Sequence, residues 1–312
     1  MKALVTGGAG FIGSHIAERL VSQGNDVRIL DNLSSGKREN LASFGSKVEF
    51  VEGDIRDAAK VDAMAAGCDV VFHEAAIVSV PYSVEHPQET HDTNIQGTLN
   101  VLLSARKANV KRVVFASSAA IYGDDPTLPK SEAMLPLPIS PYGVEKLTAE
   151  HYLRTWSQLY GIETVALRYF NVFGPRQDPS SAYSGVISIF VDKVLANAVP
   201  TIFGDGEACR DFVFVDNVVD ANIAAATRDG VSGQVFNVAC GGRTTLNDLL
   251  AMLGRIVGRE VTPRYAAARV GDIVASVADI TRARMQLGYE PRVEVEVGLR
   301  RLVDHVRSSA RP

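Results

Sequence analysis

A tyrosine and a lysine lie four residues apart in the segment SPYGVEKLTAE, which spans residues 140–150. Ser140 suits a helix N-cap and Pro141 suits the first helical position, so the segment predicts a helix that begins just before Tyr142. Residues i and i+4 share a helix face, which places Lys146 one turn beyond the phenol. The spacing is common in helices, so the rest of the chain must decide whether the pair does chemistry.

The chemistry available to this pair is removal of a proton from an alcohol. A free tyrosine has a pKa of roughly 10 and is a poor base at neutral pH. A nearby ammonium favours the phenolate and is expected to lower that pKa, and a nicotinamide cation would lower it further. A phenolate could accept the proton of a hydroxyl while hydride leaves the same carbon. Tyr142 is therefore the candidate base and Lys146 the group that tunes it.

A third polar group is expected from the end of a neighbouring strand. The segment VVFASSAAIYG (113–123) places Ser117 and Ser118 at the carboxyl end of a predicted strand, where open parallel sheets bind their ligands. A serine hydroxyl there could donate to a developing carbonyl oxygen and orient the substrate alcohol. Taken alone, the two serines are equally consistent with residues that simply end a strand.

A glycine-rich turn follows the first predicted strand and leads into the first predicted helix. In VTGGAGFIGSH, Gly8, Gly10 and Gly13 fit G-x-G-x-x-G, and Gly7 with the last two fits G-x-x-G-x-x-G. Such glycines let the backbone approach a pyrophosphate, whose charge is then bound by free N–H groups at the helix N-terminus. A plain glycine turn is the alternative, and the strand–turn–helix context favours dinucleotide binding.

Acidic residues end the next two predicted strands. A carboxylate at Asp31 can accept hydrogen bonds from both hydroxyls of an adenosine ribose and repel a 2′-phosphate, which favours NAD over NADP. Lys37 and Arg38 would argue for NADP, but they lie beyond Asp31 in a polar loop. Asp54 and Ile55 end the third strand, where an adenine edge could be bound, although a helix cap explains Asp54 equally well.

Strand and helix patterns alternate through the first half of the chain. Strands are predicted at 2–6, 26–30, 47–51, 69–73, 112–117 and 163–169, and helices near 11–23, 57–66, 87–108 and 141–160. This alternation predicts parallel strands with right-handed crossovers, hence a doubly wound α/β Rossmann sheet. After about residue 170 the strand signals become short, which predicts a smaller mixed α/β C-terminal lobe. We therefore divide the chain into 1–170 and 171–312, with 210–229 and 234–239 as candidates to rejoin the first part.

Composition narrows the class of protein. The 312 residues are 46% hydrophobic and 22% charged. The net charge of −4 and the pI near 5.9 give no excess of positive charge that would favour binding of a nucleic acid. The three cysteines have neither disulfide-framework nor metal spacing, and the six histidines form no HxxxH or HxH pattern, so no metal site is predicted. No segment reaches the roughly 18 apolar residues of a membrane span. A cytoplasmic enzyme is expected.

The chain resembles the extended short-chain dehydrogenases/reductases, in particular the UDP-hexose 4-epimerases. The similarity covers nearly the whole chain and is carried by TGGAGFIGSH, DNLSSG, GDIRD, SSAAIYGD, SPYGVEK, RYFNVFGPRQDP, GDGEACRDFVFVDN and RVGDI. It implies the catalytic residues Ser118, Tyr142 and Lys146, the last of which also binds the nicotinamide ribose. It implies NAD contacts at Gly7, Gly10, Phe11, Ile12, Gly13, Asp31, Asn32, Asp54, Ile55, Ala75, Asn94, Tyr142, Lys146 and Tyr169. UDP-sugar contacts are implied at Ser118, Asn171, Arg210, Arg269, Asp272 and Ser276.

The resemblance also bears on which reaction is performed. Related 4,6-dehydratases carry an Asp-Glu pair directly after the catalytic serine or threonine, and related decarboxylases usually carry a Glu. This chain has Ala119 and Ala120 there, which leaves inversion at C4 through a 4-keto sugar as the expected reaction. Some bacterial UDP-galactose epimerases carry a lysine where this chain has Val78, so the chain resembles a different branch.

The small side chain of Ser276 indicates which sugar the protein is expected to accept. Glucose-restricted epimerases carry a bulky tyrosine there, whereas a serine leaves room for an N-acetyl group, and RYFNVFGPRQDP also resembles the UDP-N-acetylglucosamine branch. A pocket of that size rejects the smaller UDP-glucose only weakly. A UDP-glucose-only or UDP-uronic acid epimerase, another nucleotide-sugar dehydratase or reductase, and an NAD-sensing protein without catalysis stay open. The family further implies a homodimer through the helices near 87–108 and 141–160.

Overall fold

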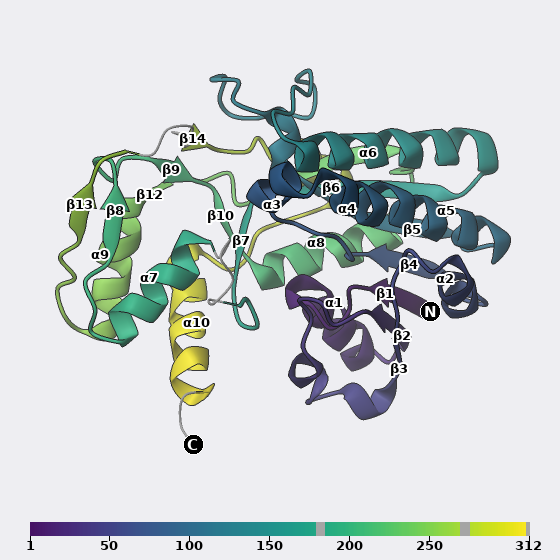
Figure 1. Cartoon of the computed structure of the whole chain (residues 1–312), viewed down its shortest axis with the longest axis horizontal. Coiled ribbons are helices and arrows are strands. Elements are labelled where there is room, and N and C mark those ends of the chain that lie inside the picture. Colours follow the sequence, from purple (N-terminus) through teal and green to yellow (C-terminus); the bar gives the residue numbers. More distant parts are fainter. Residues whose placement is uncertain (179–184, 269–274, 310–312) are drawn as a thin grey trace.

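A seven-stranded parallel sheet organises the larger part of the molecule. The computed structural model describes residues 1–178, 185–268 and 275–309 (Figure 1). The strands of the sheet are β1 (Lys2–Thr6), β2 (Asp26–Asp31), β3 (Val48–Glu52), β4 (Val70–His73), β5 (Arg112–Ser118), β6 (Glu163–Tyr169) and β11 (Gln234–Val238). Their order is β11-β6-β5-β4-β1-β2-β3. Strands β2 and β3 are added on one side of β1 and the later strands on the other, so the strand order reverses between β1 and β4. Ligands of such sheets bind beyond the carboxyl ends of the strands at this point.

The predicted fold class is confirmed. All six predicted strands are present, and the segment predicted at 234–239 returns to the sheet as β11, parallel to β6. The segment at 210–229 returns instead as helix α8 (Val215–Thr227), which packs on β5, β6 and α1. The division of the chain at residue 170 stays a prediction.

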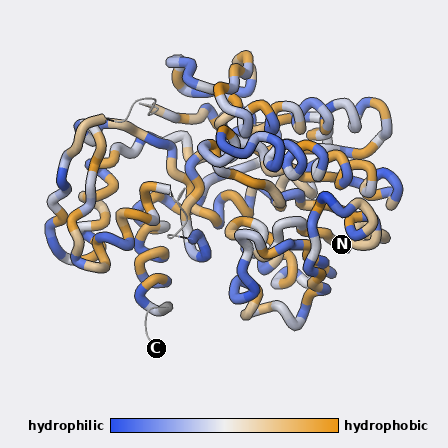
Figure 2. Tube along the Cα trace, viewed as in Figure 1, coloured by the Kyte–Doolittle hydropathy of each residue, from blue (hydrophilic) through white to orange (hydrophobic). Residues whose placement is uncertain are grey.

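Helices cover both faces of the sheet. Helix α1 (Phe11–Ser22) and α8 lie on one face, and α2 (Ala58–Ala65), α5 (Gly97–Lys107) and α6 (Pro141–Tyr160) lie on the other (Figure 1). Alternate residues of β1 therefore face different cores: Ala3 and Val5 belong to the same core as Ile16 of α1, whereas Leu4 belongs to the core that includes Leu153 of α6. Burial on both sides explains the apolar runs in the central strands β1, β4 and β5, which lie among the orange segments of the tube in Figure 2.

The helix predicted over 87–108 is interrupted. It consists of α4 (Pro87–His91), a π-helical turn η3 (Asp92–Gln96) and α5. A π-helical turn inserts one extra residue, and here it contains Asn94, whose side-chain amide is bonded to Ile77 and Glu145 outside the helix. A further short helix that the sequence pattern did not predict, α3 (Val80–Glu85), precedes it and is capped by Ser79.

The C-terminal lobe has its own core and several small sheets. β7 (Asn171–Phe173) pairs with β10 (Phe212–Phe214), β8 (Thr201–Phe203) pairs with β13 (Arg264–Ala266), and β9 (Cys209–Arg210) lies between β12 (Thr244–Thr245) and β14 (Ala275–Ser276). Its helices are α7 (Val186–Leu195), α9 (Leu246–Val257) and α10 (Val295–Ser309). Phe173, Phe190 and Leu299 are buried in its core. Within the described ranges, no helix is both long and apolar enough to cross a membrane.

Candidate active site

Helix α6 begins as its sequence predicts. The Ser140 hydroxyl accepts a hydrogen bond from the Gly143 N–H at 3.2 Å, and Pro141 occupies the first turn. The backbone N–H of Tyr142 donates to the hydroxyl of Ser83 in α3 at 3.1 Å. These contacts fix the start of the helix. They therefore also fix the position of Tyr142 relative to the carboxyl ends of the strands.

The three residues predicted to be catalytic come together at the end of β5. The Ser118 hydroxyl lies close enough to the Tyr142 phenol to lower its pKa by hydrogen bonding. The Lys146 ammonium donates to the carbonyl of Ala116 at 2.8 Å and lies 5.8 Å from the centre of the Tyr142 ring. Both Tyr142 and Lys146 are buried. The helix and the strand therefore hold a hydroxyl, a phenol and an ammonium in a fixed arrangement.

The structure distinguishes the two serines that the sequence left equivalent. The Ser117 hydroxyl donates to Glu150 Oε1 at 2.5 Å inside the protein. That carboxylate also accepts two hydrogen bonds from the Arg168 guanidinium, at 2.9 and 2.7 Å. Ser117 thus belongs to a buried ion-pair cluster behind the site, whereas Ser118 faces Tyr142.

Contrary to the prediction from the sequence, the pKa of Tyr142 is not lowered when no ligand is bound. Burial raises the pKa of Tyr142 to about 12, and the hydrogen bond with Ser118 opposes this only in part. Burial also lowers the pKa of Lys146 to about 8, since a charged ammonium is costly in a site shielded from water. The prediction from the Tyr–Lys spacing was wrong here because it neglected burial of both groups. The phenol is therefore neutral at pH 7 before ligands bind.

The glycine turn makes a close approach between β1 and the segment after β4. A side chain at Gly7, whose φ is +68°, would meet the Ala75 N at 2.7 Å, and a side chain at Gly13 would meet the Gly7 carbonyl oxygen at 2.2 Å. Helix α1 starts after Gly10 with no side chain capping its N-terminus and no acidic residue in its first turn. Phe11 and Ile12 occupy that turn, where backbone N–H groups are available to an anion.

Asp31 lies against the glycine turn. It is 6% exposed, and its two carboxylate oxygens accept hydrogen bonds from the Ala9 N–H at 2.9 Å and the Leu33 N–H at 2.8 Å. A carboxylate oxygen can accept a second hydrogen bond, so both remain able to meet ribose hydroxyls. The uncapped helix, the glycine cradle and this carboxylate together fit the diphosphate and adenosine ribose of NAD.

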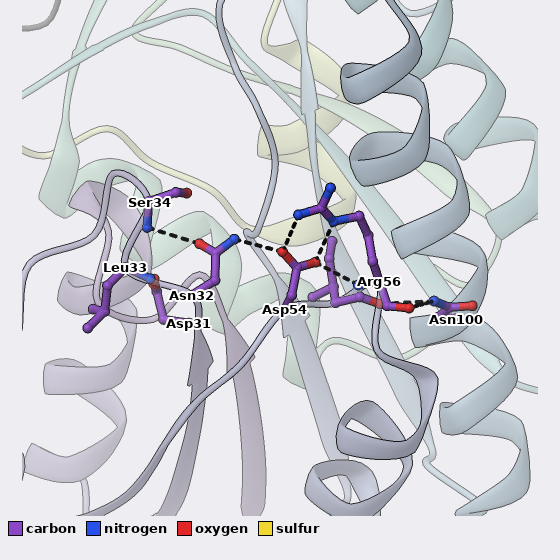
Figure 3. Close-up of polar contacts among 8 residues, drawn as sticks. Asp31, Asn32, Leu33, Ser34, Asp54, Arg56 and Asn100 are labelled. Carbon is purple, nitrogen blue, oxygen red and sulfur yellow. Dashed lines mark hydrogen bonds and ion pairs between the residues drawn. The ribbon is translucent and has the colours of Figure 1, made fainter.

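The acidic residue after the third strand is held by an arginine that the sequence analysis missed. Asp54 is bonded to Arg56 through two side-chain contacts, at 3.0 and 2.8 Å, and accepts from Asn32 Nδ2 at 2.9 Å (Figure 3). These bonds lower the pKa of Asp54 to about 2. Asn100 of α5 donates to the backbone carbonyls of Ile55 and Arg56. The predicted cofactor residue Asn32 is therefore joined to the braced segment that contains Asp54 and Ile55.

Two further predicted cofactor residues also brace the site. The Asn94 side chain accepts from the Ile77 N–H at 2.8 Å and donates to the Ile77 carbonyl and to Glu145, at 2.9 and 2.7 Å. Tyr169 is buried, donates to Glu74 Oε1 at 3.0 Å and accepts from Asn222 at 2.7 Å. Both amide hydrogens of Asn94 are used inside the protein, so any contact with a cofactor would use its oxygen.

Three of the predicted substrate residues, Asn171, Arg210 and Ser276, gather around Asp211, whereas Ser118 lies at the end of β5. Ser276 is paired with Arg210 across β14 and β9, and the Asp211 N–H donates to the Ser276 carbonyl at 2.8 Å. The Asn171 N–H donates to the Asp211 carbonyl at 3.2 Å. Predicted contacts Arg269 and Asp272 lie outside the described residues.

Asp211 itself was missed from the sequence. It is fully buried, and its carboxylate accepts the N–H groups of Cys240, Gly241 and Ala278 at 2.9, 2.9 and 3.2 Å. Burial nevertheless raises its pKa to about 6. Its only sequence signal was its place beside Arg210, so its role in joining three loops appears only in the fold.

We expect Gly13→Ala to weaken NAD binding at least about tenfold, which corresponds to ~1.4 kcal/mol. The added methyl group would lie 2.2 Å from the Gly7 carbonyl and must displace the turn. Calorimetric titration with NAD would measure the loss. Gly45→Ala is the matched control, because its methyl group meets only Leu41 Cβ at 3.6 Å. Wild-type affinity in Gly13→Ala would show that the turn does not hold the cofactor.

Comparison with known proteins places this architecture in a family. Residues 3–239 match the NAD-dependent epimerase/dehydratase family. The chain belongs to this family. A UDP-glucose 4-epimerase of Mycolicibacterium smegmatis is 41% identical over 314 residues, which cover 99% of this chain and 100% of that protein. The family assignment makes the protein an enzyme and NAD its cofactor, in agreement with the fit of the glycine turn and Asp31.

Two solved structures of family members are similar over nearly their whole length. The UDP-glucose 4-epimerase of Thermotoga maritima, solved with UDP-glucose, has a TM-score of 0.93 and 42% identity, with 99% of each chain covered. The UDP-N-acetylglucosamine 4-epimerase of Methanobrevibacter ruminantium, in complex with UDP-N-acetylmuramic acid, has a TM-score of 0.94 and 40% identity, covering 99% of this chain and 98% of that one.

Proposed function

We propose that this family member is a UDP-sugar 4-epimerase that interconverts UDP-N-acetylglucosamine and UDP-N-acetylgalactosamine and also accepts UDP-glucose and UDP-galactose. The observation that carries the epimerase assignment is the Ser118–Tyr142–Lys146 arrangement at the end of β5. Relatives about two-fifths identical over the full chain are named as 4-epimerases, which supports the same reaction.

In this proposal each residue of the arrangement has a defined role. The Tyr142 oxygen takes the proton of the sugar 4-hydroxyl. It returns that proton after the 4-keto sugar has rotated to present its other face. Ser118 orients that hydroxyl and donates to the 4-keto oxygen. Lys146 keeps a positive charge beside the phenol and binds the nicotinamide ribose. NAD, when bound, supplies the acceptor and donor of hydride and a positive charge that favours the phenolate.

The residues after Ser118 support inversion over elimination. Ala119 and Ala120 begin the short helix η4 (Ala119–Tyr122), and the Ala120 N–H donates to the Ser118 hydroxyl at 3.1 Å. Neither residue carries a carboxyl group that could remove a proton from C5 or protonate a leaving hydroxyl. The absence of a carboxyl group at these two positions supports reduction of the 4-keto sugar again, on either face, over elimination.

The diphosphate and the sugar would be bound by the C-terminal lobe. Arg210 lies on β9, next to Ser276 of β14 in register, which places a cation and a small side chain on neighbouring strands. A guanidinium matches the oxygens of a diphosphate. Asn171 completes this group through the backbone of Asp211. The serine leaves space for an N-acetyl group, and this supports the wider substrate range.

The predicted homodimer and cytoplasmic location form part of the proposal. Exposed apolar side chains lie along the two helices expected to pair: Leu103 of α5 is 47% exposed, and Val144 and Leu159 of α6 are 48% and 67% exposed. Burial of these side chains against a second copy would stabilise a dimer through the hydrophobic effect.

A product assay tests the proposal directly. Purified protein would receive UDP-N-acetylglucosamine and UDP-glucose in separate reactions, with and without added NAD, and NMR would identify the products. Conversion of both to their 4-epimers is the expected result. Conversion of UDP-glucose alone would contradict the substrate range, and a 4-keto-6-deoxy sugar product would contradict the reaction.

We expect Ser276→Tyr to lower kcat/KM for UDP-N-acetylglucosamine at least about 100-fold, while UDP-glucose turnover falls less than about tenfold. The phenol would occupy the space of the N-acetyl group, and a steric mismatch of this size is worth roughly 3 kcal/mol. Ser276→Ala is the control, because it keeps the space open. Equal losses for both sugars in Ser276→Tyr would mean that the residue does not line the sugar pocket.

A further inference from the structure

Glu74 is a carboxylate at the active site to which the proposed mechanism gives no task. It follows β4 directly, at the carboxyl edge of the sheet. In the β4–β5 pairing His73 is opposite Phe115, so the next step of this register brings Glu74 beside Ala116. The Ala116 carbonyl is the acceptor for the Lys146 ammonium. Glu74 and Lys146 therefore both lie near the Ala116 backbone at the carboxyl edge of the sheet.

Glu74 is fixed in this position from the other side of β5. Its Oε1 accepts the hydroxyl of Tyr169 at 3.0 Å, and Tyr169 is the β6 partner of Ser118. The Tyr169 hydroxyl in turn accepts from Asn222 of α8. A chain of hydrogen bonds from α8 thus holds the carboxyl at the edge where β4, β5 and β6 end.

The other two acidic residues near Lys146 are already engaged. Glu145 accepts hydrogen bonds from Thr90 and Asn94, both at 2.7 Å. Glu150 forms a buried ion pair with Arg168, whose Nη2 lies 2.7 Å from Oε2. Glu74 has only a phenol as its hydrogen-bond partner among the described contacts, and its negative charge favours the charged form of Lys146.

Four other side chains at this point of the sheet are uncharged in the part of the chain that the structure describes. Tyr142 lies on the same helix, with its phenol neutral at pH 7, and the Phe115 ring lies 4.7 Å from the ammonium. His73 is buried between Thr6 and Thr98, and burial together with the Lys146 charge lowers its pKa to about 3, so it is neutral. Tyr169 is also neutral, because burial raises its pKa well above the usual value.

We propose that Glu74 is a positioning residue for the Tyr142–Lys146 pair, whose carboxylate is the counter-charge that keeps the buried Lys146 protonated. Burial raises the pKa of Glu74 to about 7 and lowers that of Lys146 to about 8, so the two groups titrate in neighbouring ranges of pH. Only between these ranges are both charged. The inference rests on the proposed function to the extent that Lys146 must be an ammonium for turnover.

The test measures the Lys146 charge without turnover. Lysine labelled with ¹³C at Cε would be titrated by NMR, with the Lys146 signal assigned by its absence in Lys146→Met. We expect Glu74→Gln to lower the Lys146 midpoint by about one pH unit, a tenfold change in its protonation equilibrium. Glu163→Gln is the matched control, because Glu163 pairs with Arg112 at the opposite edge of the sheet and should leave the midpoint unchanged.

A reciprocal measurement covers the case in which Glu74→Gln does not fold. Coupling between two sites is mutual, so Lys146→Met should raise the midpoint of the ¹³C-labelled Glu74 carboxyl. Thermal unfolding and Glu74→Asp, which keeps the charge, separate loss of the fold from loss of charge. An unchanged Lys146 midpoint in folded Glu74→Gln, or an unchanged Glu74 midpoint in Lys146→Met, would overturn the proposal.

The pH profile of kcat links this charge to turnover. In the wild type, activity should fall as pH rises through the range where Lys146 loses its proton. In Glu74→Gln this alkaline fall should begin at lower pH, while activity at lower pH, where Lys146 is protonated with or without Glu74, should be retained. A shifted Lys146 midpoint in a protein whose wild type epimerises no UDP-sugar would refute the proposed function and leave the counter-charge standing.

Discussion

Tyr142→Phe is expected to reduce kcat for epimerisation about 10³-fold or more, within the range that general base catalysis contributes. The substitution removes only the phenol oxygen and keeps the buried ring that packs at the start of α6. NAD should remain bound, because the glycine turn and Asp31 are untouched. Initial rates with UDP-N-acetylglucosamine, together with the NAD content of the denatured protein, would measure both effects.

The matched control for this variant is Tyr265→Phe. Tyr265 lies on β13 in the C-terminal lobe, is 54% exposed and donates to Asn247 at 3.0 Å. It loses the same single oxygen and should retain full activity. If Tyr142→Phe turned over within about tenfold of the wild-type rate, a different group would have to be the base. Loss of NAD together with activity would instead indicate damage to the cofactor site.

Arg168→Met is expected to lower the free energy of unfolding by about 3–5 kcal/mol, the usual cost of leaving one partner of a buried ion pair. The side chains of Arg168 and Glu150 are 4% and 5% exposed, so water cannot replace the lost cation. The variant also removes a hydrogen bond to the Tyr122 hydroxyl at 2.9 Å. Denaturant unfolding followed by circular dichroism would give the difference.

Two further variants make this stability prediction specific. Arg38→Met breaks an exposed pair, in which Arg38 and Glu52 are 60% and 57% exposed, and should cost no more than about 1 kcal/mol. Removal of both buried charges in Glu150→Met/Arg168→Met should be less damaging than Arg168→Met alone, because no unpaired charge remains. A loss below about 1 kcal/mol for Arg168→Met would mean that the fold tolerates Glu150 without its partner and would contradict the prediction.

Much of the fold could be predicted because the signals are local. Each strand of the Rossmann sheet is a short run of apolar residues, and each is followed by a turn and an amphipathic segment, so the alternation alone indicates parallel strands. Ser140 and Pro141 marked the start of α6 for the same reason, since a helix cap depends on neighbouring residues. The spacing of Tyr142 and Lys146 then determined that both face one side of that helix.

What the sequence could not determine depends on contacts between distant segments. The choice between Ser117 and Ser118 followed from the register of β5 against α6, where Glu150 engages one and Tyr142 faces the other. The π-helical turn at Asn94 depends on bonds to Ile77 and Glu145, which no local pattern reveals.

The protonation of the site was decided in the same way. Spacing along a helix gives the distance between a phenol and an ammonium but not how much water surrounds them. Burial raised the pKa of Tyr142 and lowered that of Lys146, opposite to the expectation from their proximity alone. The sequence by itself determined which groups are present and which share a face. The tertiary structure decided their charges, because desolvation depends on every segment packed around them.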